Sequence, residues 1–243
     1  METSVFQRHE VKFLVTQAQR RRLLGAIGQR LIPDVHGENT ICNIYYDTPD
    51  FRLIRRSLEK PSYKEKVRLR SYGPVHPEDT VFLELKKKYD GVVYKRRISI
   101  SEAQATAYMA RQRGLPQDSQ IGREIAYCCR FYRSLRPSVY LCYDRTAFFG
   151  AEDSQLRITF DENIRWRRQR VSLRSRPGGR DILKPRESLM EIKTAGAMPL
   201  WLVEVLEREQ IHQTSFSKYG QAYMTMLQEK LEESRGIYYV QSV

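Results

Sequence analysis

The feature that most constrains the fold of this chain is a series of short segments in which apolar and charged residues alternate. A strand with one buried face produces this alternation, because successive side chains point to opposite sides of the sheet. In residues 64–70, four basic residues share one phase and two apolar residues share the other. Residues 81–88 repeat the pattern with a glutamate and two lysines. The sequence therefore predicts a sheet with one apolar and one charged face.

Eight such strands are predicted, with helices between and after them. The predicted strands cover residues 5–14, 41–47, 64–73, 80–88, 92–100, 138–149, 155–163 and 187–193. A first helix capped by Thr16 would carry Leu23, Leu24, Ile27 and Leu31 on one stripe. Further helices are predicted after Ser101 and over residues 119–135, 200–209 and 217–234. The basic stretch 165–186 is predicted to be a loop or a long hairpin connection.

The charged face is mostly basic in several of these strands. For any single strand a solvated outer face explains the pattern. Like charges directly opposite each other destabilise a sheet, so the repetition indicates that an anionic ligand neutralises the cations. Arginine also suits bidentate recognition of phosphate. The residues on this face are Arg8, Glu10, Lys12, Lys64, Lys66, Arg68, Arg70, Glu84, Lys86, Lys88, Arg157, Thr159, Asp161, Glu191 and Lys193.

The overall charge also indicates an anionic partner. The chain has 42 Lys and Arg against 29 Asp and Glu, a formal net charge of +13. Such a field attracts nucleic acid, anionic membranes, nucleotides and phosphate chains alike. On charge alone nucleic acid is the first candidate. The basic strands lack the aromatic residues on which bases stack, so the pattern argues against nucleic acid and favours a phosphate chain.

The strands can be assembled one step further, because a sheet of about eight strands can close into a barrel. We therefore expect an α+β fold in a single domain over residues 1–243, with an eight-stranded antiparallel β-barrel and peripheral helices. If the charged face points inward, the barrel encloses a cationic tunnel and the helices cover its apolar outside. The few carboxylates inside would hold Mg²⁺ or Mn²⁺, which bind through oxygen ligands together with substrate phosphates.

Nine short motifs then occur in a characteristic order between residue 7 and about residue 225. They are RHEVK, YYDTPD, KVRLRSYG, LELKKK, KRR, YDRTAF, LRITFD, LMEIK and SFSKYG. In this order they resemble the catalytic domain of the vacuolar transporter chaperone polyphosphate polymerases, of the triphosphate tunnel metalloenzyme superfamily. The resemblance implies an antiparallel barrel around a tunnel, ATP as phosphoryl donor, polyphosphate as product and a divalent metal, often Mn²⁺.

The resemblance, carried over position by position, implies roles for individual residues, and several of these residues also lie on the charged face of the predicted strands. The predicted catalytic residues are Arg68, Arg70, Lys86, Arg145, Arg157 and Lys218. The predicted phosphate-binding residues are Lys12, Lys66, Lys95, Arg97, Tyr143, Lys193 and Ser217. Glu191 and Glu10 are the predicted metal ligands.

The first strand departs from many tunnel enzymes, which open with two glutamates and a lysine at alternating positions. Here Arg8 stands at the first of these positions, which leaves Glu10 and Lys12. This argues against the two-metal site of adenylate cyclases and thiamine triphosphatases, and agrees with the polymerase branch. The regulatory domain and membrane helices of the yeast-type polymerases are not found, and no signal peptide or membrane span is predicted. We expect a cytoplasmic protein, with a membrane-protein partner if it serves a membrane process.

Three functions stay open from the sequence. The first is metal-dependent polyphosphate synthesis from ATP, with inorganic triphosphatase activity when water attacks. The second is a polyphosphate-binding or sensing module without catalysis, and the third is an RNA-type triphosphatase. Three residues have simpler structural explanations. Glu191 and Lys193 could form a plain surface ion pair, and Asp47 is expected to shape a turn before Pro49 rather than to bind metal.

Overall fold

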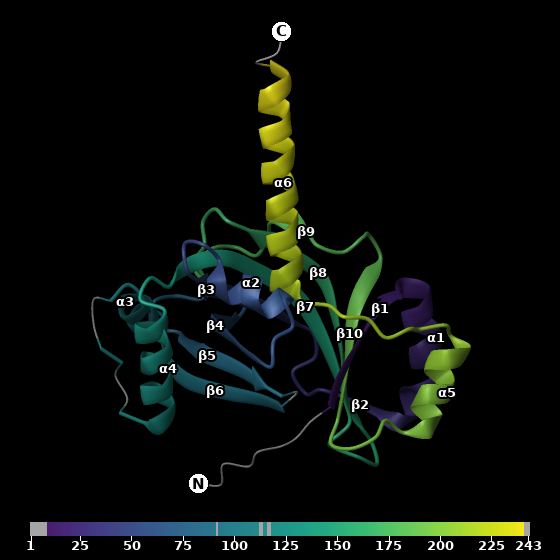
Figure 1. Ribbon diagram of the computed structural model, residues 1–243. Helices are drawn as coiled ribbons and strands as arrows, with labels where there is room; N and C mark the ends of the chain where they lie inside the picture. The colour runs from purple at the N-terminus through teal and green to yellow at the C-terminus, as the bar shows by residue number, and fades with distance from the viewer. Residues whose placement is uncertain (1–8, 91, 112–113, 116–117, 241–243) are drawn as a thin grey trace.

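A computed structural model describes residues 9–90, 92–111, 114–115 and 118–240, with side chains up to residue 233. Ten strands form one antiparallel sheet, in which eight follow the order β1-β10-β8-β7-β3-β4-β5-β6 (Figure 1). The strands are β1 His9–Thr16, β2 Leu31–Pro33, β3 Asn39–Asp47, β4 Tyr63–Tyr72, β5 Thr80–Tyr89, β6 Val92–Ser101, β7 Arg136–Gly150, β8 Arg157–Arg167, β9 Arg180–Asp181 and β10 Glu187–Thr194. The short β2 and β9 pair with β7 and β8.

All eight predicted strands are confirmed, but the predicted closed barrel is wrong. Within the described residues β1 and β6 stand at opposite ends of the pairing path and do not pair with each other. The free edge of β1 is covered by another segment instead. The amide of Thr214 donates to the carbonyl of Lys12 at 2.7 Å, and Phe13 forms an isolated bridge with Gln213. The result is an open, curved sheet with one concave face. Residues 5–8 of the first predicted strand, including Arg8, lie outside the described residues.

Six α-helices surround the described part of the sheet. They are α1 Gln17–Ile27, α2 Arg52–Leu58, α3 Glu102–Met109, α4 Gln120–Phe131, α5 Leu200–Arg208 and α6 Lys218–Val240, and a 3₁₀ turn spans Gly28–Arg30. Thr16 and Ser101 cap α1 and α3 as predicted, and both form capping boxes, with Gln19 and Gln104 as reciprocal partners. Leu31 does not continue the first helix as predicted, because the chain has already turned into β2.

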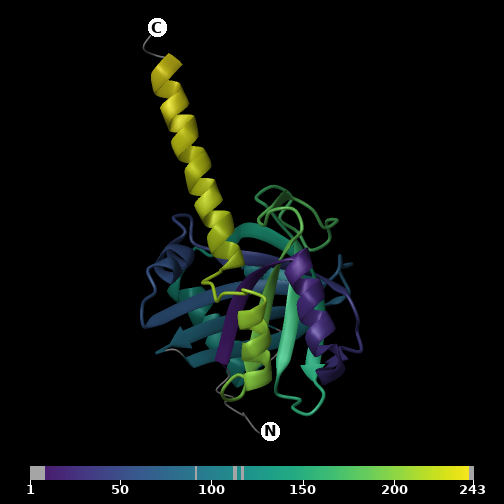
Figure 2. The same cartoon turned by 90° about the vertical axis from the view of Figure 1, so that its right-hand side faces the viewer.

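Helices cover the convex face of the sheet in two groups (Figures 1 and 2). α1 and α5 pack on the half formed by β1, β10 and β8, and α3 and α4 pack on the half formed by β4, β5 and β6. Each group buries its own apolar cluster against the apolar phase of the strands, which faces outward from the concavity. Representative members are Leu23, Phe160, Met190 and Leu202 in the first cluster, and Leu69, Leu83, Ile98 and Ile125 in the second. The charged phase is therefore left for the concave face.

The long helix α6 begins at one end of the concave face and then projects from the body (Figures 1 and 2). Its Tyr219, Tyr223 and Met226 pack with Tyr45 and Leu189 in a third apolar cluster. These contacts fill one end of the concavity and leave the rest to charged side chains. No helix in the described residues is long and apolar enough to cross a membrane.

Candidate functional site

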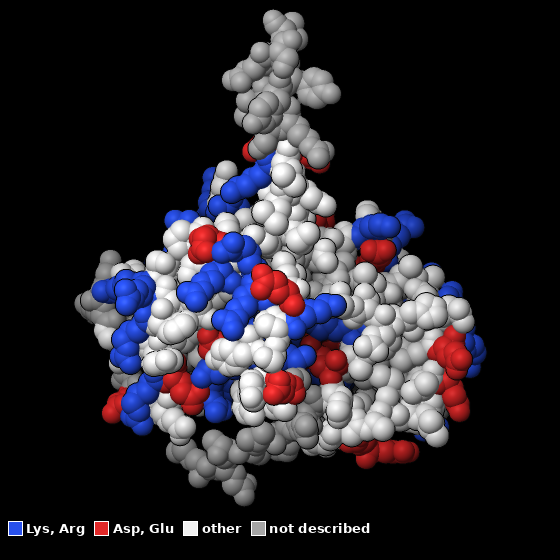
Figure 3. Space-filling model, viewed as in Figure 1, with Lys and Arg blue, Asp and Glu red and all other residues white. Residues whose placement is uncertain are grey.

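The register of the sheet places like charges side by side on the concave face. Lys66 of β4 lies opposite Lys86 of β5, which lies opposite Lys95 of β6. One row along, Arg68 lies opposite Glu84, which lies opposite Arg97. Cross-strand repulsion of this kind costs free energy unless anions stand between the cations. Figure 3 shows Lys and Arg gathered over this half of the molecule.

Glu84 is the carboxylate around which the cations of β4 and β6 gather. Its side chain is 1% exposed and is bound by Arg68 at 2.6 Å, Lys95 at 2.9 Å and Arg97 at 2.5 Å. Burial opposes ionisation of this carboxyl, but the field of Arg68, Arg70 and Lys95 outweighs it and holds the pKa well below its usual range. Glu84 is therefore ionised at any working pH and organises three cations into a fixed array.

Arg70 stands beside this array and has neutral partners. Its guanidinium donates to Asn43 Oδ1 at 3.0 Å and to the hydroxyl of Tyr143 at 3.3 Å. Arg68 likewise donates to the hydroxyl of Tyr45 at 3.3 Å. No ion pair of Arg70 with a carboxylate occurs in the described residues. Because Arg70 is buried and has no carboxylate partner among the described residues, a bound anion would balance its positive charge.

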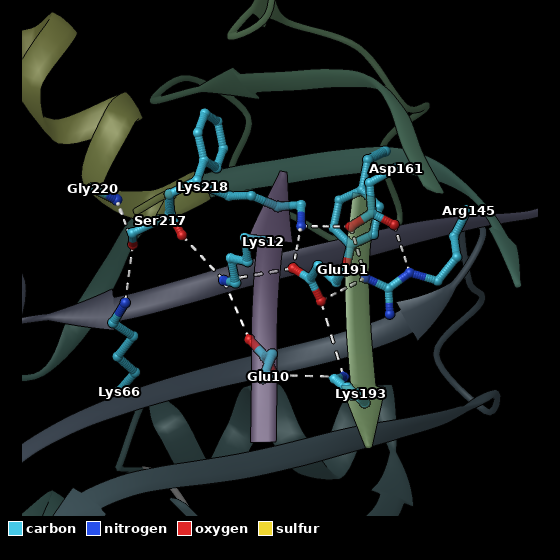
Figure 4. Close-up of polar contacts among 12 residues, drawn as sticks. Glu10, Lys12, Lys66, Arg145, Asp161, Glu191, Lys193, Ser217, Lys218 and Gly220 are labelled. Atoms are coloured by element: carbon cyan, nitrogen blue, oxygen red, sulfur yellow. Dashed lines mark hydrogen bonds and ion pairs between the residues drawn. The ribbon is translucent and has the colours of Figure 1, made fainter. Parts of the chain in front are cut away.

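A second array surrounds Glu191 on the facing half of the sheet (Figure 4). This carboxylate is buried at 7% exposure and has cations on every side. The contacts are Lys218 at 3.3 Å, Lys12 at 3.6 Å, Arg145 at 3.7 Å and Lys193 at 3.9 Å. Burial raises the pKa of Glu191, but these cations outweigh burial and hold it well below its usual value. The alternative of a plain surface ion pair is therefore wrong.

Asp161 fixes the positions of two of these cations. Arg145 donates to both carboxylate oxygens of Asp161, at 2.6 and 2.7 Å, in a bidentate pair. Lys218 approaches the same carboxylate at 2.5 Å. The Tyr143 ring lies below both cations, 5.2 Å from the guanidinium carbon and 4.6 Å from the ammonium nitrogen. Because Tyr143 also accepts from Arg70, it joins the two arrays.

Glu10 completes a small carboxylate pair with Glu191. Lys12 lies 3.4 Å from Glu10 as well as 3.6 Å from Glu191, and Lys193 lies 3.6 Å from Glu10. Burial works against ionisation of Glu10, but Lys86 and the neighbouring lysines leave its pKa lowered. Two ionised carboxylates fit Mg²⁺ or Mn²⁺ in the mode in which substrate phosphates supply the other ligands. The described residues contain no group of three or more acidic, His or Cys residues that could hold a metal by themselves.

The first turn of α6 connects the strands of the site (Figure 4). Lys12 donates to the carbonyl of Phe216 at 3.1 Å, and Lys66 donates to the hydroxyl of Ser217 at 3.0 Å. The amide of Gly220 also donates to this hydroxyl, at 3.1 Å. A Cβ atom at Gly220 would lie 3.1 Å from Leu58, so the glycine lets α6 approach α2. Residues 216–218, at the entry to α6, thus contact β1, β4, β8 and β10.

Several lysines on this face have lowered pKa values, so they lose their charge more easily than an ordinary lysine. Burial, with repulsion from neighbouring lysines, lowers the pKa of Lys66 to about 8. Burial also lowers the pKa of Lys95 to about 8, although Glu84 opposes the shift. The pKa values of Lys86 and Lys193 are lowered by burial as well. A bound anion would reverse each of these shifts, because it favours the charged form.

The predicted site residues therefore converge, with one exception. The two arrays and their immediate neighbours bring together ten cations and four carboxylates, an excess of six positive charges within this set. They are Lys12, Lys66, Arg68, Arg70, Lys86, Lys95, Arg97, Arg145, Lys193 and Lys218, with Glu10, Glu84, Asp161 and Glu191. Arg157 instead lies at the rim, where it pairs with Asp34 at 3.2 Å and covers the Phe149 ring.

Four residues of the site were given no role from the sequence: Glu84, Asp161, Asn43 and Tyr45. Glu84 and Asp161 lie in the same alternation phase as the predicted cations, and this phase was the available signal. The expected turn-forming role of Asp47 is confirmed. It is buried and accepts from the amides of Thr48, Leu53 and Ile54, which fixes the turn into α2. It also accepts from the hydroxyl of Tyr219 at 2.9 Å.

One known protein is similar to this chain in sequence, and others are similar in fold. Vacuolar transporter chaperone complex subunit 4 of Schizosaccharomyces pombe is 28% identical over 146 residues, which is 51% of this chain and 20% of that protein. The chain thus matches about a fifth of the length of this relative. Two solved structures, candidate adenylate cyclases from Bacillus halodurans and Vibrio parahaemolyticus, share the fold with TM-scores of 0.53 and 0.51. They are 15% and 12% identical, with 87% and 89% of this chain and 95% and 97% of those chains covered. Residues 7–227 match the VTC domain, and the chain therefore belongs to the VTC domain family.

Proposed function

We propose that this chain binds the phosphates of ATP and of polyphosphate on its concave face and transfers phosphoryl groups between them. Membership of the VTC family supports a polyphosphate-related phosphoryl transfer. The observation that carries the proposal is the convergence of ten cations from six strands and the first turn of α6 around four carboxylates. A linear chain of phosphates has the charge density and the length to neutralise such a surface.

The array around Glu84 and the array around Glu191 would bind different parts of the substrate. Phosphoryl transfer depends on in-line positioning and charge neutralisation more than on covalent chemistry by the protein. Arg68, Arg70 and Lys86 would hold phosphates of the donor on one half of the sheet. Arg145 and Lys218 would neutralise charge on the transferred group from the other half. Arg70 and Lys86 are the best placed for this role, because neither forms an ion pair with a carboxylate in the described residues.

The reaction itself needs no strong base from the protein. A terminal phosphate oxygen of the acceptor chain is already anionic and would attack the γ-phosphorus of ATP. The bond from this phosphorus to the bridging oxygen breaks, and ADP leaves. Water in place of the acceptor would give triphosphatase activity. Glu191 and Glu10 would hold a divalent metal together with phosphate oxygens, and the metal would supply further neutralisation of charge on these oxygens.

The direct test is incubation of the purified chain with ATP and Mn²⁺, followed by gel analysis for polyphosphate and an assay for ADP and orthophosphate. We expect turnover that depends on the metal, and we expect Glu191→Gln to abolish it while tripolyphosphate binding is retained. Glu207→Gln, a change of the same kind on the exposed side of α5, is the matched control. Absence of turnover with any divalent metal or phosphate primer would rule out the enzyme.

A non-catalytic polyphosphate-binding module is the second candidate, and one observation favours it. Glu10, Glu84, Asp161 and Glu191 each pair with at least two cations of the protein. None of these four carboxylates is therefore free of protein cations and available only to a metal. Such a module would bind polyphosphate with strong salt dependence and without turnover. Isothermal titration with long-chain polyphosphate, beside the turnover assay, separates the two candidates.

A further inference from the structure

A corner of the molecule outside the concave face carries a second concentration of positive charge. It is formed by α2, the end of α4 with the turn that follows it, the start of β7 and the residue that follows β8. Six exposed arginines lie there: Arg52, Arg56, Arg130, Arg133, Arg136 and Arg168. None of them forms an ion pair with a carboxylate in the described part of the chain. Neighbouring exposed arginines are paired, for example Arg55 with Asp50 and Arg123 with Asp118.

Ring contacts join these arginines into one surface. The guanidinium carbon of Arg52 lies 5.8 Å from the centre of the Phe131 ring, which connects α2 with α4. The guanidinium carbon of Arg168 lies 5.7 Å from the Phe51 ring, which connects the end of β8 with α2. Arg136 pairs in register with Asp47, just before the turn into α2. The segments are therefore neighbours in space, although they are far apart in the sequence.

Exposed aromatic rings lie among these arginines. Tyr127 and Phe131, one turn apart on α4, are 63% and 53% exposed. Their rings stack on each other, with centroids 6.4 Å apart and planes 23° apart. Large exposed aromatic residues are costly in water and are enriched where bases or partners cover them. The six arginines together with Tyr127 and Phe131 are called the arginine–aromatic surface below.

We propose that the arginine–aromatic surface binds single-stranded nucleic acid. Unpaired guanidinium groups recognise the phosphates of a backbone, and exposed rings offer faces on which unstacked bases lie. A phosphate chain has no bases and gains nothing from Tyr127 and Phe131. An anionic membrane would be served equally well by lysine and by exposed aliphatic residues, whereas all six cations here are arginine. The basic strands lack stacking rings, and this surface supplies them from helices instead.

The test measures binding of a fluorescent single-stranded oligonucleotide of about 16 nucleotides by anisotropy. The double variant Tyr127→Ala, Phe131→Ala should weaken binding at least about tenfold, because each stacked base contributes about 1–3 kcal/mol. The double variant Arg52→Gln, Arg168→Gln should weaken it and lower the salt dependence, by about 0.7 in the logarithmic slope for each backbone phosphate that is no longer neutralised. Arg123→Gln, an exposed arginine of α4 that is paired with Asp118, is the matched control and should change nothing.

Two further arms make the outcome decisive. Saturating tripolyphosphate, which the proposed function places on the concave face, should leave oligonucleotide binding intact, and so should Glu191→Gln. Displacement of the oligonucleotide by tripolyphosphate would place it on the concave face and overturn the proposal. Binding to vesicles of phosphatidylcholine and phosphatidylserine without oligonucleotide binding would overturn it as well. The arginine and aromatic variants are at exposed positions, and unchanged circular dichroism would show that they and the buried Glu191→Gln variant fold. Neither outcome depends on turnover of ATP, so this proposal and the proposed function fail separately.

Discussion

Lys218 at the start of α6 and Asp161 in the middle of β8 form a 2.5 Å ion pair in the interior of the molecule. Both side chains are almost fully buried, at 10% and 0% exposure. The pair ties the projecting helix to the sheet and sets Lys218 beside Glu191. Burial lowers the pKa of Lys218, but Asp161 and Glu191 outweigh it and raise the pKa, so the lysine stays charged.

Breaking this pair from one side should destabilise the fold. Lys218→Met leaves Asp161 buried with one cation fewer, and loss of one partner of a buried pair costs about 3 kcal/mol or more. Lys218→Met should lower the free energy of unfolding in urea by about this amount. The double variant Lys218→Met, Asp161→Asn should cost clearly less than the two single variants together. Strict additivity would show that the pair is not coupled.

Glu84 should stabilise the fold only while the cations around it lack a phosphate ligand. Glu84→Gln leaves Arg68, Arg97 and Lys95 without their buried anion, so we expect a loss of about 3 kcal/mol or more. Tripolyphosphate should then raise the melting temperature of Glu84→Gln more than that of the unaltered chain, because it fills the same role. Glu78→Gln, at an exposed position before β5, is the control. An equal shift in all three proteins would mean that phosphate does not reach this array.

The same carboxylate gives the fold a defined response to acid. The pKa of Glu84 in the folded chain is held far below the ordinary value of 4.5. Its contribution to stability is therefore complete above pH 4.5 and is lost as the pH falls toward the folded-state pKa. Urea unfolding measured between pH 3 and pH 7 should show a smaller loss of stability with acid in Glu84→Gln than in the unaltered chain. An identical pH dependence in both would contradict the depressed pKa.

Binding of polyphosphate should weaken as the pH rises through about 8. Lys66 and Lys95 each have a pKa of about 8 in the free protein, against 10.5 ordinarily, so they lose their charge above this pH. Bound phosphate favours the charged form, so affinity should fall by up to about tenfold per pH unit for each lysine. Lys66→Arg and Lys95→Arg stay charged and should flatten the profile, as followed by titration with long-chain polyphosphate between pH 7 and pH 9.5. A flat profile for the unaltered chain would mean that neither lysine contacts the anion.

Strand alternation was enough to predict the strands and to place many residues of the candidate site on one face of the sheet. Lys12, Lys66, Lys86 and Lys193 could be assigned to one face, because the period of a strand is a local property of the sequence. Closure of the sheet could not be predicted in this way. Whether β1 pairs with β6 depends on what else reaches the edge of β1, and residues 213–214, far along the chain, do so.

The resident carboxylates were missed for a related reason. Glu84 and Asp161 lie in the right alternation phase, but their importance comes from which cations face them across the sheet. Such pairings depend on register and topology, which a single sequence does not reveal. The first turn of α6 shows the same limit. Ser217 and Lys218 could be placed before a helix, whereas their contacts with Lys66 and Asp161 required the full fold.

Asp47 should act on the site only through the position of α6. Its carboxylate accepts from three backbone amides of the turn into α2 and from the hydroxyl of Tyr219, the residue after Lys218. Asp47→Ala leaves these buried donors without an acceptor, which costs about 1–3 kcal/mol for an unsatisfied group. We expect a lower melting temperature together with weaker tripolyphosphate binding, because Tyr219 no longer anchors the turn that carries Ser217 and Lys218. Tyr219→Phe removes one of these bonds and keeps the ring that stacks on Tyr45 at 4.7 Å, so it should show a smaller loss in both measurements. If Asp47→Ala melts earlier but binds tripolyphosphate as before, α6 is held in place by its other contacts alone.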